Sequence, residues 1–178
     1  MTSFNDVVKW RRMFHQYPEL SKYEYKTTQR IKDILTSYNI KMIDIPMETG
    51  LVAEIGQGEK CIAVRTDIDA LPIQEQVSQD FTSTNDGVMH ACGHDIHMAS
   101  ILAIATKLKE EEEQLNGRVR FLFQPAEELG YGAKVMAKTN ALDDVQAIIG
   151  FHNSPTLDIG EFAIKRSEER RVGKECRS

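Results

Sequence analysis

Apolar residues recur at helical spacing in three parts of the chain. The first run follows Ser3, which forms a capping-box pattern with Asp6, and it should stop before Pro18. The second run covers roughly residues 23–38, and the third covers residues 94–114. The pattern therefore predicts three long helices, the last of which begins in a segment rich in histidine.

Between these helices the pattern changes to short runs of branched and apolar residues, which predict strands. The runs lie at residues 41–45, 51–55, 61–66, 119–123, 147–151 and 159–164. Gln57 and Gly58 indicate a hairpin between the second and third strands, and the runs at 119–123 and 147–151 are apolar enough to be buried on both faces. A short helix is expected within residues 130–138. Alternating strands and helices predict an α/β domain with a mixed, largely parallel sheet flanked by helices.

The composition is that of a soluble globular protein. Hydrophobic residues make up 41% and charged residues 28% of the 178 residues, and no apolar run approaches the roughly 18 residues that cross a bilayer. The N-terminus lacks a signal-peptide pattern, so we expect a cytoplasmic protein that does not bind membranes. The formal net charge of -5 argues against nucleic acid as a partner.

The last thirteen residues differ from the rest of the chain. Residues 166–178 read RSEERRVGKECRS and carry a net positive charge, whereas residues 1–165 are net negative. The segment has one aliphatic side chain, Val172, and no periodicity that would anchor it. We therefore expect residues 166–178 to be a basic tail that is disordered or an artefact of the sequence.

The densest chemistry lies in the octet at residues 90–97, which reads HACGHDIH. Cysteine and histidine are the ligands that zinc and its neighbours prefer, and the start of a helix favours a thiolate at Cys92. Three interpretations remain open at this point. The octet could form a metal site, it could hold a nucleophilic cysteine beside a histidine, or it could combine a buried cysteine with surface histidines.

Further ionisable residues follow three of the predicted strands. Asp67 and Asp69 follow the strand at 61–66, Glu127 and Glu128 follow the strand at 119–123, and His152 follows the strand at 147–151. Because ligands of open α/β sheets bind beyond the carboxyl ends of the strands, these groups should meet. The combined set exceeds the needs of one tetrahedral ion, which indicates two metals. One of the adjacent glutamates could bind metal while the other takes a proton from water.

Five segments, in this order, match the pattern of one known family. They are RRMFHQYPELSKYEYKT at 11–27, DIDALPIQE at 67–75, HACGHDIH at 90–97, FQPAEELGYGA at 123–133 and GFHNSP at 150–155. Residues 8–165 thereby resemble the dinuclear metal-dependent amidohydrolases of the aminoacylase and carboxypeptidase type. The cysteine-containing octet resembles the subgroup with hippurate hydrolase, N-acetyldiaminopimelate deacetylase and indoleacetyl-amino-acid hydrolase. Residues 1–165 are then expected to form the N-terminal segment of a zinc-peptidase-like catalytic domain.

The resemblance implies roles for individual residues. Glu127 is expected to be the general base, and Asp69 to orient a metal ligand. Asp95 and His97, with His90, are expected to support the ligands or pack the helix. The expected metal ligands are Cys92, which would bridge the two ions, His94, Glu128 and His152.

The implied reaction is hydrolysis of the amide bond of a small N-acyl amino acid, which gives a carboxylic acid and a free amino acid. Two divalent ions would polarise the scissile carbonyl and lower the pKa of a bridging water, and Glu127 would carry its proton to the leaving amine. A cysteine ligand leaves zinc, manganese, cobalt or nickel as the metals. The resemblance also implies a homodimeric parent protein.

The chain departs from this family in length. Family members continue after the GFHNSP segment into a lid domain and then supply one more histidine ligand, whereas no histidine follows His152 here. We therefore expect a truncated chain with an incomplete catalytic domain and little turnover. Two alternatives stay open, namely a cysteine-nucleophile hydrolase that uses Cys92 with His152 or His94, and a metal-binding fragment without catalysis.

Three further residues are expected to be structural. His15 should pack at the end of the first helix, and Cys61 should be a small buried residue of its strand. Arg65 should form an ion pair with an acidic neighbour.

Overall fold

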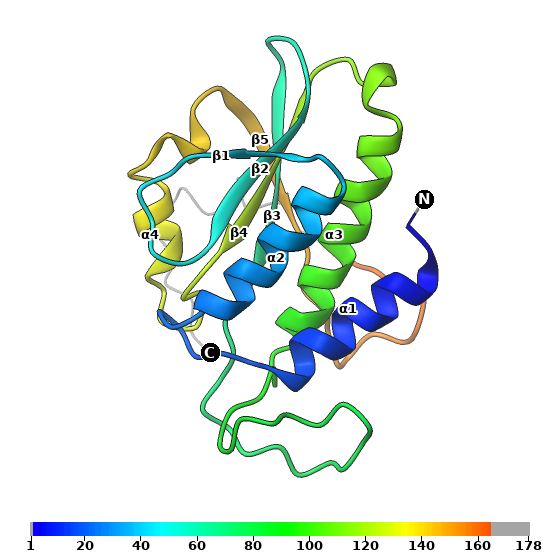
Figure 1. The fold of residues 1–178 in the computed structure, drawn as a ribbon, viewed down its shortest axis with the longest axis vertical. Helices are drawn as coiled ribbons and strands as arrows, with labels where there is room; N and C mark the ends of the chain where they lie inside the picture. The colour runs from blue at the N-terminus through cyan, green and yellow to red at the C-terminus, as the bar shows by residue number, and fades with distance from the viewer. Residues whose placement is uncertain (1, 165–178) are drawn as a thin grey trace.

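A five-stranded mixed sheet lies at the centre of the computed structural model, which describes residues 2–164 (Figure 1). The strands are β1 (Lys41–Ile43), β2 (Leu51–Gly56), β3 (Cys61–Asp67), β4 (Arg118–Gln124) and β5 (Val145–Gly150). The helices are α1 (Phe4–Gln16), α2 (Tyr25–Ser37), α3 (His94–Glu110) and α4 (Gly132–Met136), with short 3-10 turns η1 (Glu112–Gln114) and η2 (Asn140–Leu142). The predicted mixed sheet flanked by helices is confirmed.

The order of strands in the sheet is β1-β2-β4-β3-β5. β2 pairs antiparallel with β1 and β4, whereas β3 pairs parallel with β4 and β5. The predicted hairpin between β2 and β3 is therefore wrong, because β4 lies between them. Six of the seven residues of β4 are buried, because β4 has a neighbouring strand on each side and elements packed on both of its faces.

Helices cover both faces of the sheet. α1, α2 and α3 lie on one side of the sheet (Figure 1). In the main core on this side, Ile31, Leu35 and Leu102 cluster with Phe121 and Phe123 of β4. On the opposite face α4 and η2 pack against the alternate residues of the strands, in a smaller cluster. The cluster contains Val52, Ala63, Leu122, Met136 and Ala141. This alternation along the strands gives the sheet two buried faces.

The local signals of the first helix work as predicted. The Ser3 hydroxyl accepts a hydrogen bond from the backbone N–H of Asp6, and the Asp6 carboxylate accepts one from the backbone N–H of Ser3. α1 ends at Gln16, before Pro18. The capping box therefore sets where the first helix begins, and the proline limits where it ends.

Two predictions about the end of the described chain are wrong. β5 lies at the edge of the sheet with Ile148 and Ile149 more than half exposed, so it is not buried on both faces. Residues 159–164 form no strand. Both runs are apolar, but burial depends on a neighbouring element, which the apolar pattern does not specify. The tail at 166–178, including Cys176, lies outside the described residues.

The sheet brings the predicted chemical segments to one edge. The parallel strands β3, β4 and β5 all end at this edge, so Asp67, the turn after Gln124 and the loop after Gly150 leave it together. α3 also begins beside it, at His94. Within residues 2–164, no helix combines the length and apolar character needed to span a membrane.

The core supports a test of stability. Leu102 of α3 is fully buried, whereas Ile104 on the same helix is 42% exposed. We expect Leu102→Ala to lower the free energy of unfolding by about 2–5 kcal/mol, because it leaves a cavity between helix and sheet. Ile104→Ala should change it by less than about 0.5 kcal/mol, as an exposed substitution does. Urea unfolding of both variants measures the difference, and equal losses would contradict this packing.

Candidate metal centre

The structure brings all the predicted ligands together at the edge of the sheet. Cys92 comes from the turn just before α3, His94 is the first residue of α3, Glu128 comes from the turn after β4, and His152 from the loop after β5. One donor atom from each of Cys92, His94 and His152 lies within 4.8 Å of the others, and the same holds for His94 with Glu127 and Glu128. Segments distant in sequence thus form one cluster, with His94 in both groups.

His94 is fully buried and is fixed from one side. Its Nδ1 lies 2.9 Å from the backbone oxygen of Asp69 and 3.3 Å from the carboxylate of the same residue. Since a carbonyl oxygen only accepts, Nδ1 is the protonated nitrogen and donates to it. Burial acts to lower the pKa of His94, but the hydrogen bond to Asp69 and the charge of Asp67 outweigh it and raise the pKa. In the neutral imidazole, which is the form that binds a metal, Nε2 carries the lone pair, and it faces Glu127 at 4.0 Å and Glu128 at 3.9 Å.

The donor set fits a divalent ion. Nε2 of His94 and Oε1 of Glu128 are both buried without a hydrogen-bond partner among the described residues. Buried polar atoms normally have a partner, and this imidazole nitrogen and this carboxylate oxygen lie 3.9 Å apart, so one cation could bridge them. Imidazole, thiol and carboxylate together are typical of zinc and of neighbouring transition metals.

Asp69 connects His94 to two other segments. Its Oδ2 accepts a hydrogen bond of 2.7 Å from the Ser21 hydroxyl and one of 3.0 Å from the backbone N–H of Glu128. Burial acts to raise the pKa of Asp69, but the hydrogen bonds from His94, Ser21 and Glu128 outweigh it and lower the pKa. The carboxylate therefore stays ionised, as the predicted role of orienting a ligand requires.

Cys92 and His152 meet at the open side of the cluster. The Cys92 sulfur lies 3.2 Å from Nε2 of His152. Burial, together with the charges of Glu128 and Glu127, raises the pKa of the Cys92 thiol to about 12. The expectation that the helix start favours a thiolate is therefore wrong for the protein alone, because burial and nearby carboxylates outweigh the helix dipole.

Asp67 also belongs to the cluster. The sequence predicts its place at the end of a strand but no role for it. Its carboxylate forms a group within 4.8 Å with His94 and His97, all of them buried. Burial raises the pKa of Asp67 to about 6, although Arg65 pairs with it. The expected ion pair of Arg65 is thereby confirmed.

Asp95 points away from the ligands. Its Oδ2 lies 2.8 Å from Nδ1 of His15 and 2.9 Å from the Arg11 guanidinium, and Nε2 of His15 lies 3.0 Å from Glu75. His15 is buried, as expected, but it is also the centre of a charged network that the sequence did not indicate. This network joins α1, the loop before α3 and the first turn of α3, so Asp95 anchors the segment that carries His94.

The remaining histidines of the octet are buried. The ring centre of His97 lies 5.3 Å from that of His94 and 4.7 Å from that of His152, so His97 packs directly behind the cluster. Burial lowers the pKa values of both His97 and His90 to about 4, which keeps both rings neutral. Cys61 is fully buried in β3, as expected for a small core residue.

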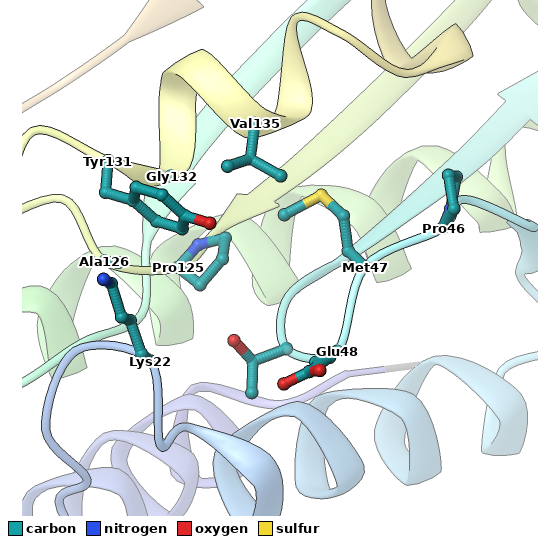
Figure 2. Close-up of a pocket in the computed structure, with 10 residues that line it drawn as sticks. Lys22, Pro46, Met47, Glu48, Pro125, Ala126, Tyr131, Gly132 and Val135 are labelled. Carbon is teal, nitrogen blue, oxygen red and sulfur yellow. The ribbon is translucent and has the colours of Figure 1, made fainter.

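A cavity of about 280 Å³ lies next to the turn that carries the glutamates (Figure 2). Ala126, the residue before Glu127, lines it, and Met47 and Val135 give it apolar walls. The Lys22 ammonium lies 4.2 Å from the centre of the Tyr131 ring at its side. The predicted ligands do not line this cavity, so it is a neighbour of the metal centre and not a part of it.

Comparison with protein families identifies one family model. The model of peptidase family M20/M25/M40 matches residues 63–167. N-acetylcysteine deacetylase from Bacillus subtilis is 46% identical over 162 residues, which make up 89% of this chain and 43% of that protein.

Two solved structures extend the comparison. A dinuclear metal-binding peptidase of the M20 family from Bacillus subtilis has a TM-score of 0.84 at 47% identity, over 86% of this chain and 44% of that one. Human carnosine dipeptidase 1 shares the fold with a TM-score of 0.65 at 13% identity, over 84% of this chain and 38% of that one. The chain thus spans less than half the length of these relatives.

The contacts of Asp69 predict its effect on metal binding. We expect Asp69→Asn to weaken the binding of Zn²⁺ or Co²⁺ by about 10–100-fold, because the carboxylate no longer holds the His94 imidazole and the Glu128 backbone. Competition with a chromogenic chelator measures the affinity. Asp44→Asn, at an exposed position, makes the same change of charge and should leave the affinity unchanged. Equal affinities for the two variants would show that Asp69 orients nothing.

The His15 network predicts a pH-dependent stability. The hydrogen bond to Asp95 raises the pKa of His15 above its usual 6.5, so the stabilisation is complete below pH 6.5 and is lost as the pH rises through the folded-state pKa. His15→Gln should therefore lower the free energy of unfolding more at about pH 5.5 than at about pH 9. Urea unfolding at both values measures this. Leu102→Ala removes no titratable group and should cost the same at both, and a pH-independent loss for His15→Gln would contradict the network.

Proposed function

The chain belongs to peptidase family M20/M25/M40, and on that premise we propose that the protein carrying this sequence hydrolyses the amide bond of N-acyl amino acids. The observation that carries the proposal is the cluster of Cys92, His94, Glu128 and His152, with Glu127 beside it. A relative of 46% identity is named N-acetylcysteine deacetylase, which supports small acylated amino acids as the substrate class. Residues 1–165 would form part of the metal-dependent catalytic domain.

Cys92, His94, Glu128 and His152 would hold two divalent ions in this proposal. A related structure is described as dinuclear, which supports the number, and the thiol and imidazole donors favour zinc, manganese, cobalt or nickel. Bound ions would polarise the scissile carbonyl and make water more acidic.

Glu127 is the proposed general base. Its carboxylate lies next to the ligand Glu128 and 4.0 Å from Nε2 of His94, and its side chain is 37% exposed. An exposed carboxylate at the open side of the cluster can accept a proton from water and return it to the leaving amine. Glu128 is more buried, and its unpartnered oxygen faces His94, which favours it as the ligand of the two.

The alternative is a hydrolase that uses Cys92 as its nucleophile. The contact of 3.2 Å between the Cys92 sulfur and His152 supports it, because a histidine within reach can activate a thiol. The raised pKa of this thiol and the three carboxylates around it argue against it. The two mechanisms differ in whether an acyl group becomes attached to Cys92.

The substrate class and the metal requirement are tested together. The full product of the gene that encodes this sequence is loaded with Zn²⁺, Mn²⁺, Co²⁺ or Ni²⁺, and the release of free amino acid is measured with N-acetylcysteine and other N-acyl amino acids. We expect a chelator to abolish release and the metal to restore it. Release that survives chelation, an acyl adduct on Cys92 in mass spectra, or no release from any substrate would overturn the proposal.

The adjacent glutamates predict two distinct defects. Glu127→Gln should lower kcat by about 10²–10⁴-fold with an unchanged metal content, because it removes the base and leaves the ligands. Glu128→Gln should lower the metal content itself. Elemental analysis and initial rates separate the two effects, and a loss of metal from both variants alike would contradict the division of roles.

A further inference from the structure

The two ring nitrogens of His152 have different partners. Nδ1 lies 2.6 Å from the backbone oxygen of Asn153, and Nε2 lies 3.2 Å from the Cys92 sulfur. A carbonyl oxygen only accepts, so Nδ1 carries the proton, and Nε2 then carries the lone pair and accepts from the thiol. The backbone of the residue after His152 thus determines which nitrogen faces the ligand cluster.

Asn153 is in turn held by α3. Nε2 of His97 lies 3.1 Å from the backbone nitrogen of Asn153 and 2.6 Å from its side-chain oxygen. His97 is fully buried and stands one turn after His94, so its position is fixed by the helix. One ring nitrogen either donates to the side-chain oxygen or accepts from the backbone N–H, so only one of the two contacts is a hydrogen bond at a time. Either one joins Asn153 to a rigid element.

Gly93 provides the second contact. A Cβ atom added to Gly93 would lie 2.6 Å from Oδ1, 2.7 Å from Nδ2 and 2.9 Å from Cγ of Asn153, closer than real Cβ contacts allow. The Asn153 amide consequently lies directly over the Gly93 backbone. Gly93 stands between Cys92 and His94, so this amide contacts the segment that carries two predicted ligands.

We propose that Asn153 is a positioning residue that acts through His152, holding the imidazole so that Nε2 is presented to a divalent ion. The assignment rests on the proposed function for the metal and on the described contacts for the geometry. Asn153 itself touches no reacting atom. Its side chain links the start of α3 to the loop after β5, in addition to the contact between Cys92 and His152.

The tautomer of His152 tests this without any metal. Long-range proton–nitrogen NMR spectra of the metal-free protein report which ring nitrogen is protonated. We expect the Nδ1–H form in the wild type and a mixture of both forms in Asn153→Ala. The matched control is Ser154→Ala, at the next position, where the hydroxyl bonds only with Thr156 among the described residues and the tautomer should not change. An unchanged tautomer in Asn153→Ala would refute the proposal.

Metal affinity gives a second, independent readout. Asn153→Ala should weaken Zn²⁺ or Co²⁺ binding by about 10–100-fold, as the loss of a partner behind a ligand does. Asn153→Asp keeps an oxygen in place to face His97 and should retain most of the affinity. Equal losses in the two variants would show that the contact with His97 does not matter.

The contact with Gly93 can be isolated by a double-mutant cycle. Gly93→Ala should weaken metal binding in the wild type, because the new Cβ displaces the Asn153 side chain and strains a backbone with φ of 83°. In an Asn153→Ala background only the strain remains, so the same substitution should cost less. Additive effects would overturn the proposed contact.

These outcomes are distinguishable from a failure of the proposed function. If the protein hydrolyses no N-acyl amino acid but the His152 tautomer still depends on Asn153, the positioning role stands and the assigned reaction falls. If hydrolysis is found and neither the tautomer nor the metal affinity responds to Asn153, the reaction stands and the positioning role falls.

Discussion

The contact between Asp69 and His94 holds the candidate metal centre together. The backbone oxygen and the carboxylate of Asp69 both lie at Nδ1 of His94, which leaves Nε2 as the nitrogen that faces the glutamates. The same carboxylate accepts hydrogen bonds from Ser21 and from the backbone of Glu128. Asp69 therefore fixes the orientation of the His94 imidazole and also connects it to the segments of Ser21 and Glu128. These contacts form only if the surrounding helices and strands place Ser21, Glu128 and His94 within hydrogen-bond distance of Asp69.

The sheet brings these segments together because β4 is its central strand. With β4 between β2 and β3, the parallel strands β3, β4 and β5 end at the same edge, and each releases one part of the cluster there. In the main core, Leu102 of α3 packs in the same cluster as Phe121 of β4. This packing fixes the position of α3, and of His94 at its start, relative to the sheet. The network of Asp95 and His15 adds the last restraint, because it fixes the first turn of α3 against α1. Packing and buried polar contacts thus act on the same short segment.

The sequence predicts where the helices and strands lie better than it predicts which of them are neighbours in the fold. Periodicity shows which faces of β2, β3 and β4 are apolar, and this identifies the strands, but it does not say that β4 separates β2 from β3. It also does not say that β5 lies at an exposed edge. The motifs identify, in chain order, the segments that the structure brings together at the edge of the sheet. They do not show that Asp95 turns towards His15, or that Asn153 reaches back to His97, because such pairs are set by tertiary packing between residues more than 50 positions apart.

The charge of the cluster explains why these groups belong to one site. Asp67, Glu127 and Glu128 surround the imidazole of His94, and burial raises the pKa of Asp67 to about 6 and that of the Cys92 thiol to about 12. Grouping carboxylates and a thiol in a partly buried corner opposes folding unless positive charge compensates them. Because Asp69 is kept ionised and His94 is oriented in advance, a divalent ion would meet ligands that are already in place. Binding of the ion and the stability of this corner are therefore coupled.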